Sequence, residues 1–260
     1  MSGKKPLILI TNDDGYKAKG IKALTQSLIG LGEIVVVAPD GPRSGMSSAI
    51  TSIQPIRYYL AKKDIENDIT IYACTGTPVD CVKLGISEIL DRKPDLVVSG
   101  INHGSNASIC VIYSGTMGAA IEGCLYKVPS IGFSLLDHHY DADFSHTNKI
   151  TRTLSESVLK TGLPKGVCLN VNIPHSTKEL KGIKVCKQAP GQFVKEFKKS
   201  ADGADNEIYW LTGYFENDTP DDRSTDEWAL ANGYASIVPT KVDMTAHELV
   251  DQMKNLEDLI

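Results

Sequence analysis

The chain has 260 residues and a formal net charge of −5, and 42% of its residues are apolar. This length and apolar content suffice for one large α/β domain with a buried core. The acidic balance argues against a nucleic-acid polymer held by a broad basic surface. No apolar run approaches the roughly 18 residues of a membrane helix, and the six cysteines form no CxxC pair. We therefore expect a cytoplasmic protein with reduced thiols and no membrane partner.

The first segments predict a strand, a helix and a second strand. Residues 7–11 (LILIT) and 33–38 (EIVVVA) are continuous apolar runs, which are typical of strands buried on both faces. Between them, Ile21, Leu24 and Leu28 recur at helical spacing. The three segments predict a right-handed βαβ unit with parallel strands.

The same alternation continues to residue 173. The pattern predicts strands at 68–74, 94–100, 129–135 and 166–173, helices that begin at Thr77 and Ser114, and a helix over about 145–162. Strands that alternate with helices in this way predict an α/β fold with a Rossmann-like, doubly wound, mostly parallel sheet.

Residues 180–225 break the alternation and carry many charges. They also contain six aromatic residues: Phe193, Phe197, Tyr209, Trp210, Tyr214 and Phe215. We interpret this segment as an antiparallel β-arm that projects from a single domain spanning 1–260. Its aromatic residues either meet a partner subunit or pack against their own domain, and the sequence leaves both open. Residues 226–240 and a helix over 245–259 are predicted to return to the body of the domain.

Two adjacent aspartates, Asp13 and Asp14, follow the first predicted strand. Neighbouring carboxylates repel each other and stay ionised together most easily beside a cation. Carboxylate oxygens are ligands that Mg²⁺, Mn²⁺ and Ca²⁺ prefer, and Gly15 allows the backbone to turn sharply behind the pair. A solvated acidic turn explains the pair, taken alone, equally well.

Two further polar loops leave predicted strands. Residues 39–51 contain Arg43, which suits an anion, and several small residues able to approach a metal or phosphate: Ser44, Gly45, Ser47 and Ser48. Residues 99–120 contain the neutral side chains of Asn102 and Asn106. They also contain His103, the single histidine of the three loops, while the other five histidines are scattered along the sequence. Taken alone, the first of these loops would be interpreted as flexible and His103 as solvated.

The segment Ser114-Gly115-Thr116 opens a predicted helix. Free N–H groups and the positive end of the helix dipole make such a turn an anion site, although the same residues also serve as a simple N-cap. In open α/β sheets ligands bind beyond the carboxyl ends of the strands, so we expect the three loops to converge. A dication that faces an anion site suits phosphoryl transfer to water.

Other classes of site find less support. The chain lacks a GxGxxG dinucleotide motif, a GxxxxGK[ST] P-loop and a GxSxG nucleophile elbow. Three alternatives remain open: a nucleotide sensor with this fold and no turnover, a metal-dependent glycosyltransferase, and a hydrolase in which Asp13 is a covalent nucleophile.

Several long blocks together resemble the SurE family, the survival-protein nucleotidases. The blocks are TNDDG, APDGPRSGMSSAIT, TGTPVDCVKLG, PDLVVSGINHGSN, YSGTMGAA and LNVNIP, in the family's order over about residues 7–174, with GYASIVPTKVDMT beyond 230. One departure is Ile109-Cys110, where many members carry acidic residues.

The resemblance implies a divalent-metal-dependent phosphohydrolase that acts on nucleoside 5′- and 3′-monophosphates, with exopolyphosphatase activity in some members. It implies one ion, Mg²⁺ or Mn²⁺, held by Asp13, Asp14, Ser44 and Asn102. Of these we assign Asp13, Asp14 and Asn102 as catalytic. Substrate binding is assigned to Asn12, Gly45, Asn106, Ser114, Gly115 and Thr116. The resemblance also implies that the arm at 180–225 is exchanged between subunits, which gives a homodimer or homotetramer.

Overall fold

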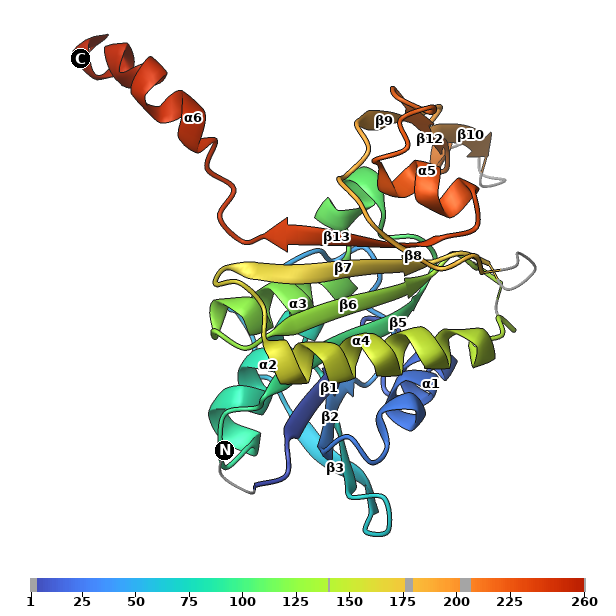
Figure 1. Ribbon diagram of the computed structural model, residues 1–260, viewed down its shortest axis with the longest axis vertical. Coiled ribbons are helices and arrows are strands. Elements are labelled where there is room, and N and C mark those ends of the chain that lie inside the picture. The colour runs from blue at the N-terminus through green and yellow to red at the C-terminus, as the bar shows by residue number, and fades with distance from the viewer. Residues whose placement is uncertain (1–3, 140, 176–179, 202–206, 260) are drawn as a thin grey trace.

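A computed structural model describes residues 4–139, 141–175, 180–201 and 207–259. Its described residues form one large sheet with the strands β1 (Leu7–Thr11), β2 (Glu33–Pro39), β3 (Tyr58–Asp64), β4 (Ile69–Cys74), β5 (Leu96–His103), β6 (Ser130–Leu135), β7 (Val167–Ile173), β8 (Ile183–Val185) and β13 (Ala235–Lys241). The strand order is β3-β4-β2-β1-β5-β6-β7-β13-β8 (Figure 1). Only β3 against β4 and β13 against β7 pair antiparallel within this sheet as described. The predicted Rossmann-like α/β class is confirmed.

Helices cover both faces of the sheet. α1 (Lys19–Leu28) and α4 (Asn148–Thr161) contact each other on one face, and α2 (Pro78–Leu84) and α3 (Gly115–Leu125) contact each other on the opposite face. Figure 1 shows α1 and α4 on the near side of the strands. The two layers account for the continuous apolar runs of the central strands, because both faces of each strand are buried.

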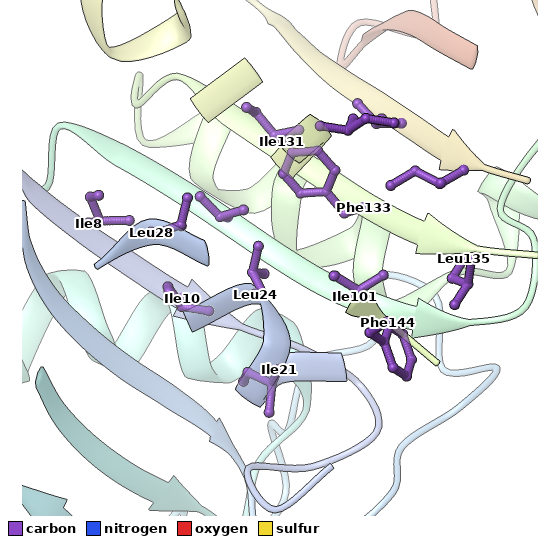
Figure 2. Close-up of a cluster of buried hydrophobic side chains, with 14 of the residues drawn as sticks. Ile8, Ile10, Ile21, Leu24, Leu28, Ile101, Ile131, Phe133, Leu135 and Phe144 are labelled. Atoms are coloured by element: carbon purple, nitrogen blue, oxygen red, sulfur yellow. The ribbon is translucent and has the colours of Figure 1, made fainter. Parts of the chain in front are cut away.

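The side chains of β1 alternate between the two layers. Ile8 and Ile10 join the core beneath α1 and α4 (Figure 2), whereas Leu7 and Leu9 join the core beneath α2 and α3. This period of two is the expected geometry of a strand. Because β1 packs into both cores, it lies in the interior of the domain, and Asn12, Asp13 and Asp14 follow directly at its carboxyl end.

The chain reverses its winding direction at β1. It passes from β1 to β2 on one side, and it returns after β4 to place β5 on the other side, with Thr11 opposite Ser99. Such a reversal is the point where ligands bind in open α/β sheets, beyond the carboxyl ends of the two strands. The loops that follow β1 and β5 therefore lie side by side.

The edge strand β3 was not predicted. Its sequence, YYLAKKD, changes from apolar to charged residues after Ala61, so it lacks the continuous apolar run of a central strand, and all but one of its residues are exposed. It pairs antiparallel with β4 and ends the sheet on that side.

The segment 180–225, expected to be an antiparallel arm, differs at its start, because β8 lies within it and pairs parallel with β13 in the large sheet. Four further short strands follow in the segment: β9 (Gly191–Val194), β10 (Phe197–Ala201), β11 (Glu207–Leu211) and β12 (Tyr214–Asn217). They form two antiparallel pairs, β10 with β11 and β9 with β12. Residues 202–206, which belong to the predicted arm, lie outside the described part of the chain. After the arm, α5 (Asp226–Ala231) and β13 lead the chain back into the sheet.

The predicted return of the C-terminal helix to the body is wrong. α6 (His247–Val250) and the 3₁₀ segment Asp251–Leu259 contain no buried residue, and Figure 1 shows them extending away from the sheet. Helical periodicity indicates an apolar face, but it does not specify which surface, if any, covers that face.

Candidate active site

Asp13 is the most deeply buried acid of the candidate site, with 3% of its surface exposed. The hydroxyl of Thr116 donates a 2.6 Å hydrogen bond to Asp13 Oδ1. Burial raises the pKa of Asp13 to about 6, the negative charge of Asp14 adds to this rise, and the Thr116 hydrogen bond opposes it. Asp13 is therefore a carboxyl group that needs a positive partner to stay ionised.

Asp14 is also largely removed from solvent. Burial raises its pKa, and the backbone N–H of His103 donates to Asp14 Oδ2 at 3.4 Å. Within the described residues, no lysine or arginine forms an ion pair with Asp13 or Asp14. Buried charges are normally paired or bound to a metal, so two adjacent carboxylates without a basic partner fit a divalent cation.

Asn102 lies near the end of β5, one residue before His103, whose backbone N–H contacts Asp14. The register between β5 and β6 shifts between Ser99 and Asn102, which is an irregularity that re-aims side chains at the end of a strand. The amide nitrogen of Asn102 donates to the carbonyl oxygen of Gly104 at 3.0 Å. Its amide oxygen is therefore the atom left for a hard cation.

The loop that carries Ser44 is fastened at both of its ends. The backbone N–H of Arg43 donates to the carbonyl oxygen of Asp13 at 2.6 Å, and the backbone N–H of Ser47 donates to Tyr113 at 3.1 Å. Ser44 and Gly45 are exposed between these two anchors. The guanidinium of Arg43, considered above for an anion, instead contacts Asp40 and the carbonyl oxygens of its surroundings.

The donor set fits a hard ion. It comprises two carboxylates, one hydroxyl and one amide, all of which are oxygen ligands. The described residues contain no cluster of three or more histidine, cysteine, aspartate or glutamate side chains able to hold a metal. The predicted set contains only two such side chains, so it relies on the neutral oxygens of Ser44 and Asn102.

The N-terminus of α3 faces Asp13 directly. A Cβ atom on Gly115 would lie 2.9 Å from Asp13 Cβ, so only glycine allows this approach. Ser114 caps the helix, and its Oγ accepts from the backbone N–H of Met117 at 3.0 Å. The structure thus brings the first turn of α3 next to Asp13, and the backbone N–H of Thr116 donates to the Asp13 carboxylate.

Asn12, assigned above to substrate binding, uses its side chain within the turn that follows β1. Its Nδ2 donates to the carbonyl oxygen of Gly15 at 3.1 Å, and its Oδ1 accepts from the backbone N–H of Gly15 at 3.2 Å. Both ends of the amide therefore shape the turn that presents the acidic pair. Gly15 has a φ of 98°, a conformation that favours glycine.

Asn106 is buried behind the helix terminus. Its Nδ2 donates to Ser134 Oγ at 2.6 Å. Sequence reasoning did not single out Ser134 as a neighbour of this site. It also missed Asp226, whose carboxylate accepts from the backbone N–H groups of Ser108 and Ala189 and so ties the loop after β5 to the base of the arm.

Histidines that are scattered along the sequence gather near the site. The ring of His138 lies against Gly104, and His175 pairs with Asp137 at 3.1 Å. The His103 ring packs edge-on against Phe144 with centroids 4.9 Å apart, and burial lowers its pKa. The loops after β5, β6 and β7 bring these residues together, and linear spacing gives no signal of that.

The fold and these residues define a class: a doubly wound α/β protein with a buried acidic pair at the switch point, opposite the N-terminus of a helix. The chain belongs to the SurE family, because the family model described as Survival protein SurE matches residues 8–195.

Similar proteins cover nearly the whole chain. A protein of Bacteroides fragilis named 5′-nucleotidase SurE is 52% identical over 99% of this chain and 100% of its own, and one of Phocaeicola vulgatus with the same name is 51% identical over 98% of each. The crystal structure of the SurE protein from Aquifex aeolicus has a TM-score of 0.82 and 38% identity, and covers 97% of this chain and 100% of its own. Among the described residues, no helix is long and apolar enough to cross a membrane.

Proposed function

We propose that this chain is a divalent-metal-dependent phosphohydrolase that releases phosphate from nucleoside 5′- and 3′-monophosphates, and from the ends of polyphosphate. The names of the relatives support a 5′-nucleotidase. The observation that carries the proposal is the contact of Asp13 with Gly115 and Thr116 at the start of α3. It supports a cation site directly beside an anion site, which is what phosphoryl transfer to water requires.

Asp13, Asp14, Ser44 and Asn102 would hold the ion, Mg²⁺ or Mn²⁺. Such an ion polarises the phosphate and lowers the pKa of water at the site. The chain's own contribution is to fix its ligands. The Thr116 hydroxyl holds one oxygen of Asp13, and the backbone N–H of His103 holds one oxygen of Asp14.

The phosphate group would lie against the first turn of α3, where the helix dipole favours negative charge. The backbone N–H of Thr116 already donates to the Asp13 carboxylate, so the backbone N–H of Gly115 is the first-turn donor that we assign to the phosphate. Ser114 Oγ accepts from Met117, so its hydroxyl proton remains available to a phosphate oxygen. Gly45 and Asn106 complete the proposed phosphate contacts. Because these donors are held before substrate arrives, they stabilise charge that develops in the transition state.

The role of Asp13 as a ligand competes with a role as nucleophile. A nucleophilic Asp13 would carry the phosphoryl group covalently before hydrolysis. Acid quench followed by mass spectrometry separates the two roles, because only the nucleophile gives an aspartyl phosphate on the peptide that contains residue 13.

We also propose that the protein acts in the cytoplasm as a homodimer or homotetramer assembled through the exchanged arm. All six cysteines are free thiols, as a reducing compartment requires. Large apolar side chains of the arm are exposed: Phe197, Tyr209, Trp210, Leu211 and Tyr214. A surface of this kind on one segment is typical of a protein–protein contact.

The test is phosphate release from a panel of nucleoside monophosphates, first with Mn²⁺ and then with excess EDTA. We expect release that depends on Mn²⁺ and is abolished in Asp13→Asn, a variant that removes charge but not volume. Saturable nucleotide binding without release would identify a sensor instead. Full activity of Asp13→Asn would disprove the site.

A further inference from the structure

Three asparagines where α3 packs against β6 and β7 form a closed ring of hydrogen bonds. The backbone N–H of Asn106 donates to Asn172 Oδ1 at 2.8 Å, and Asn172 Nδ2 donates to Asn170 Oδ1 at 3.0 Å. Asn170 Nδ2 then donates to the backbone carbonyl oxygen of Asn106 at 2.7 Å. Each member of this asparagine ring donates one bond and accepts one bond, so the direction is consistent all the way round.

The ring is fully buried and rests on rigid elements. Asn172, Asn170 and Asn106 are 0%, 2% and 4% exposed, so each amide would carry a large desolvation cost without its partners. Asn170 and Asn172 are alternate residues of β7 and therefore point to the same face. β7 is held on both sides, by β6 and by β13.

A fourth contact fixes the side chain of Asn106. Ser134 is 0% exposed, lies opposite Asn172 in the register of β6 and β7, and accepts from Asn106 Nδ2 at 2.6 Å. The backbone N–H, the backbone carbonyl and the side-chain amide of Asn106 are thus all held by side chains from two neighbouring strands. The sheet therefore fixes both the backbone and the side chain of this loop residue.

We propose that Asn170, Asn172 and Ser134 are positioning residues that hold Asn106 in place for phosphate binding. This inference rests on the proposed function, because it takes Asn106 as a phosphate contact. β6 and β7 are rigid, and their side chains hold Asn106 by hydrogen bonds. Asn106 is therefore fixed in one conformation before phosphate binds.

The test compares Ser134→Ala and Asn170→Asp with wild type in the full-length protein. Ser134→Ala removes the acceptor for Asn106 Nδ2. Asn170→Asp removes the donor to the Asn106 carbonyl and keeps the shape, but it also adds a buried carboxyl group. Ser130→Ala is the matched control, because Ser130 is an equally buried serine of the same strand whose hydroxyl donates to Val128 at the other end of the sheet. Calorimetry measures the binding of inorganic phosphate in the presence of Mn²⁺ and, separately, the binding of Mn²⁺ alone. KM and kcat are then measured for phosphate release from a nucleoside monophosphate.

We expect Ser134→Ala to weaken phosphate binding and raise KM by about tenfold, the size of one lost hydrogen bond. Asn170→Asp should weaken binding further, because its buried carboxyl group also repels an anion. The Kd for Mn²⁺ should stay within about twofold, and Ser130→Ala should match wild type. In an Asn106→Ala background, Ser134→Ala should have no further effect on phosphate binding, because a residue that acts through Asn106 has nothing left to position.

Unchanged phosphate binding in Ser134→Ala, or a full additional loss in the Asn106→Ala background, would overturn the inference. Ser134→Ala deletes a single oxygen and so decides the question even where Asn170→Asp fails to fold. The two proposals fail separately: a wild type that binds phosphate but releases none from nucleotides contradicts the proposed function, and phosphate binding still tests the ring. A wild type that releases phosphate from nucleotides but binds no inorganic phosphate overturns the ring inference and leaves the proposed function standing.

Discussion

Thr116 and Asp13 are 103 residues apart in sequence, yet the Thr116 hydroxyl donates a 2.6 Å hydrogen bond to Asp13 Oδ1. Both side chains are almost completely buried. This bond joins the end of β1 to the first turn of α3, so the proposed cation ligand and the proposed phosphate site share one junction. A change on either side of it is expected to affect both.

Removal of the Thr116 hydroxyl should shift the pH dependence of metal binding. The hydroxyl lowers the pKa of Asp13 because it stabilises the ionised form. Thr116→Val keeps the shape and loses the donor, so the pKa of Asp13 rises further. As the pH is lowered, Asp13 of the variant is therefore protonated earlier, and the variant loses Mn²⁺ affinity at a higher pH than wild type. Mn²⁺ titrations between pH 5 and pH 8 measure the shift. Thr116→Ser is the control that keeps the donor, and identical profiles for Thr116→Val and wild type would rule out this coupling.

Asp13→Asn should stabilise the metal-free protein at neutral pH. The pKa of Asp13 is raised from 3.8 to about 6, so the folded state binds this proton more tightly than the unfolded chain. Its contribution to stability is therefore present below pH 4 and is lost as the pH rises towards 6. Asparagine resembles the neutral acid, so at pH 7.5 the variant should gain up to about 3 kcal/mol in free energy of unfolding.

Denaturant unfolding in EDTA at pH 7.5 and pH 4 measures this gain. The difference between Asp13→Asn and wild type should be small at the lower pH. Added Mn²⁺ should stabilise wild type at pH 7.5 and leave the variant unaffected. A variant less stable than wild type in EDTA at pH 7.5 would show that the metal-free site carries no unfavourable charge.

A methyl group on Gly115 should separate α3 from the acidic pair. Its Cβ would stand 2.9 Å from Asp13 Cβ, closer than side chains approach, so the helix start must move. We expect Gly115→Ala to lower kcat/KM by at least about tenfold, because donors displaced from the developing charge lose most of their effect. Gly41→Ala, on the neighbouring loop, is the control, since its nearest contact would be Arg43 at 4.0 Å. Equal activity of both variants would argue against a phosphate site at this helix terminus.

A charge on the arm should weaken the oligomer. The side chain of Trp210 is 63% exposed in the single chain, as an interface residue would be before assembly. Trp210→Glu should shift the protein towards monomer in light scattering at micromolar concentration. Ile53→Glu changes an even more exposed apolar residue outside the arm and should not. If neither variant alters the measured mass, the arm is not the assembly surface.

The sequence sufficed for the parts of the fold that are buried on two faces. β1 and β2 are continuous apolar runs, and the acidic pair follows β1 directly, so its place at a strand end could be predicted. The exposed strand β3 lacks that pattern and was missed.

The asparagine ring could not be predicted from the order of residues in the sequence alone. Two asparagines spaced by two in an otherwise apolar strand were a signal of a polar contact on one face of β7. Their partner, however, follows from the neighbouring position of β6 and from the path of the loop after β5. The same holds for the C-terminal helix, whose periodicity was visible but whose exposed position was not.

Anomalous diffraction from crystals of the wild-type protein soaked in Mn²⁺ tests the central claim most directly. The account predicts one strong peak at the corner between Asp13, Asp14, Ser44 and Asn102, and its loss in Asp13→Asn crystals. No peak at that corner in wild-type crystals, with manganese bound elsewhere, would contradict it.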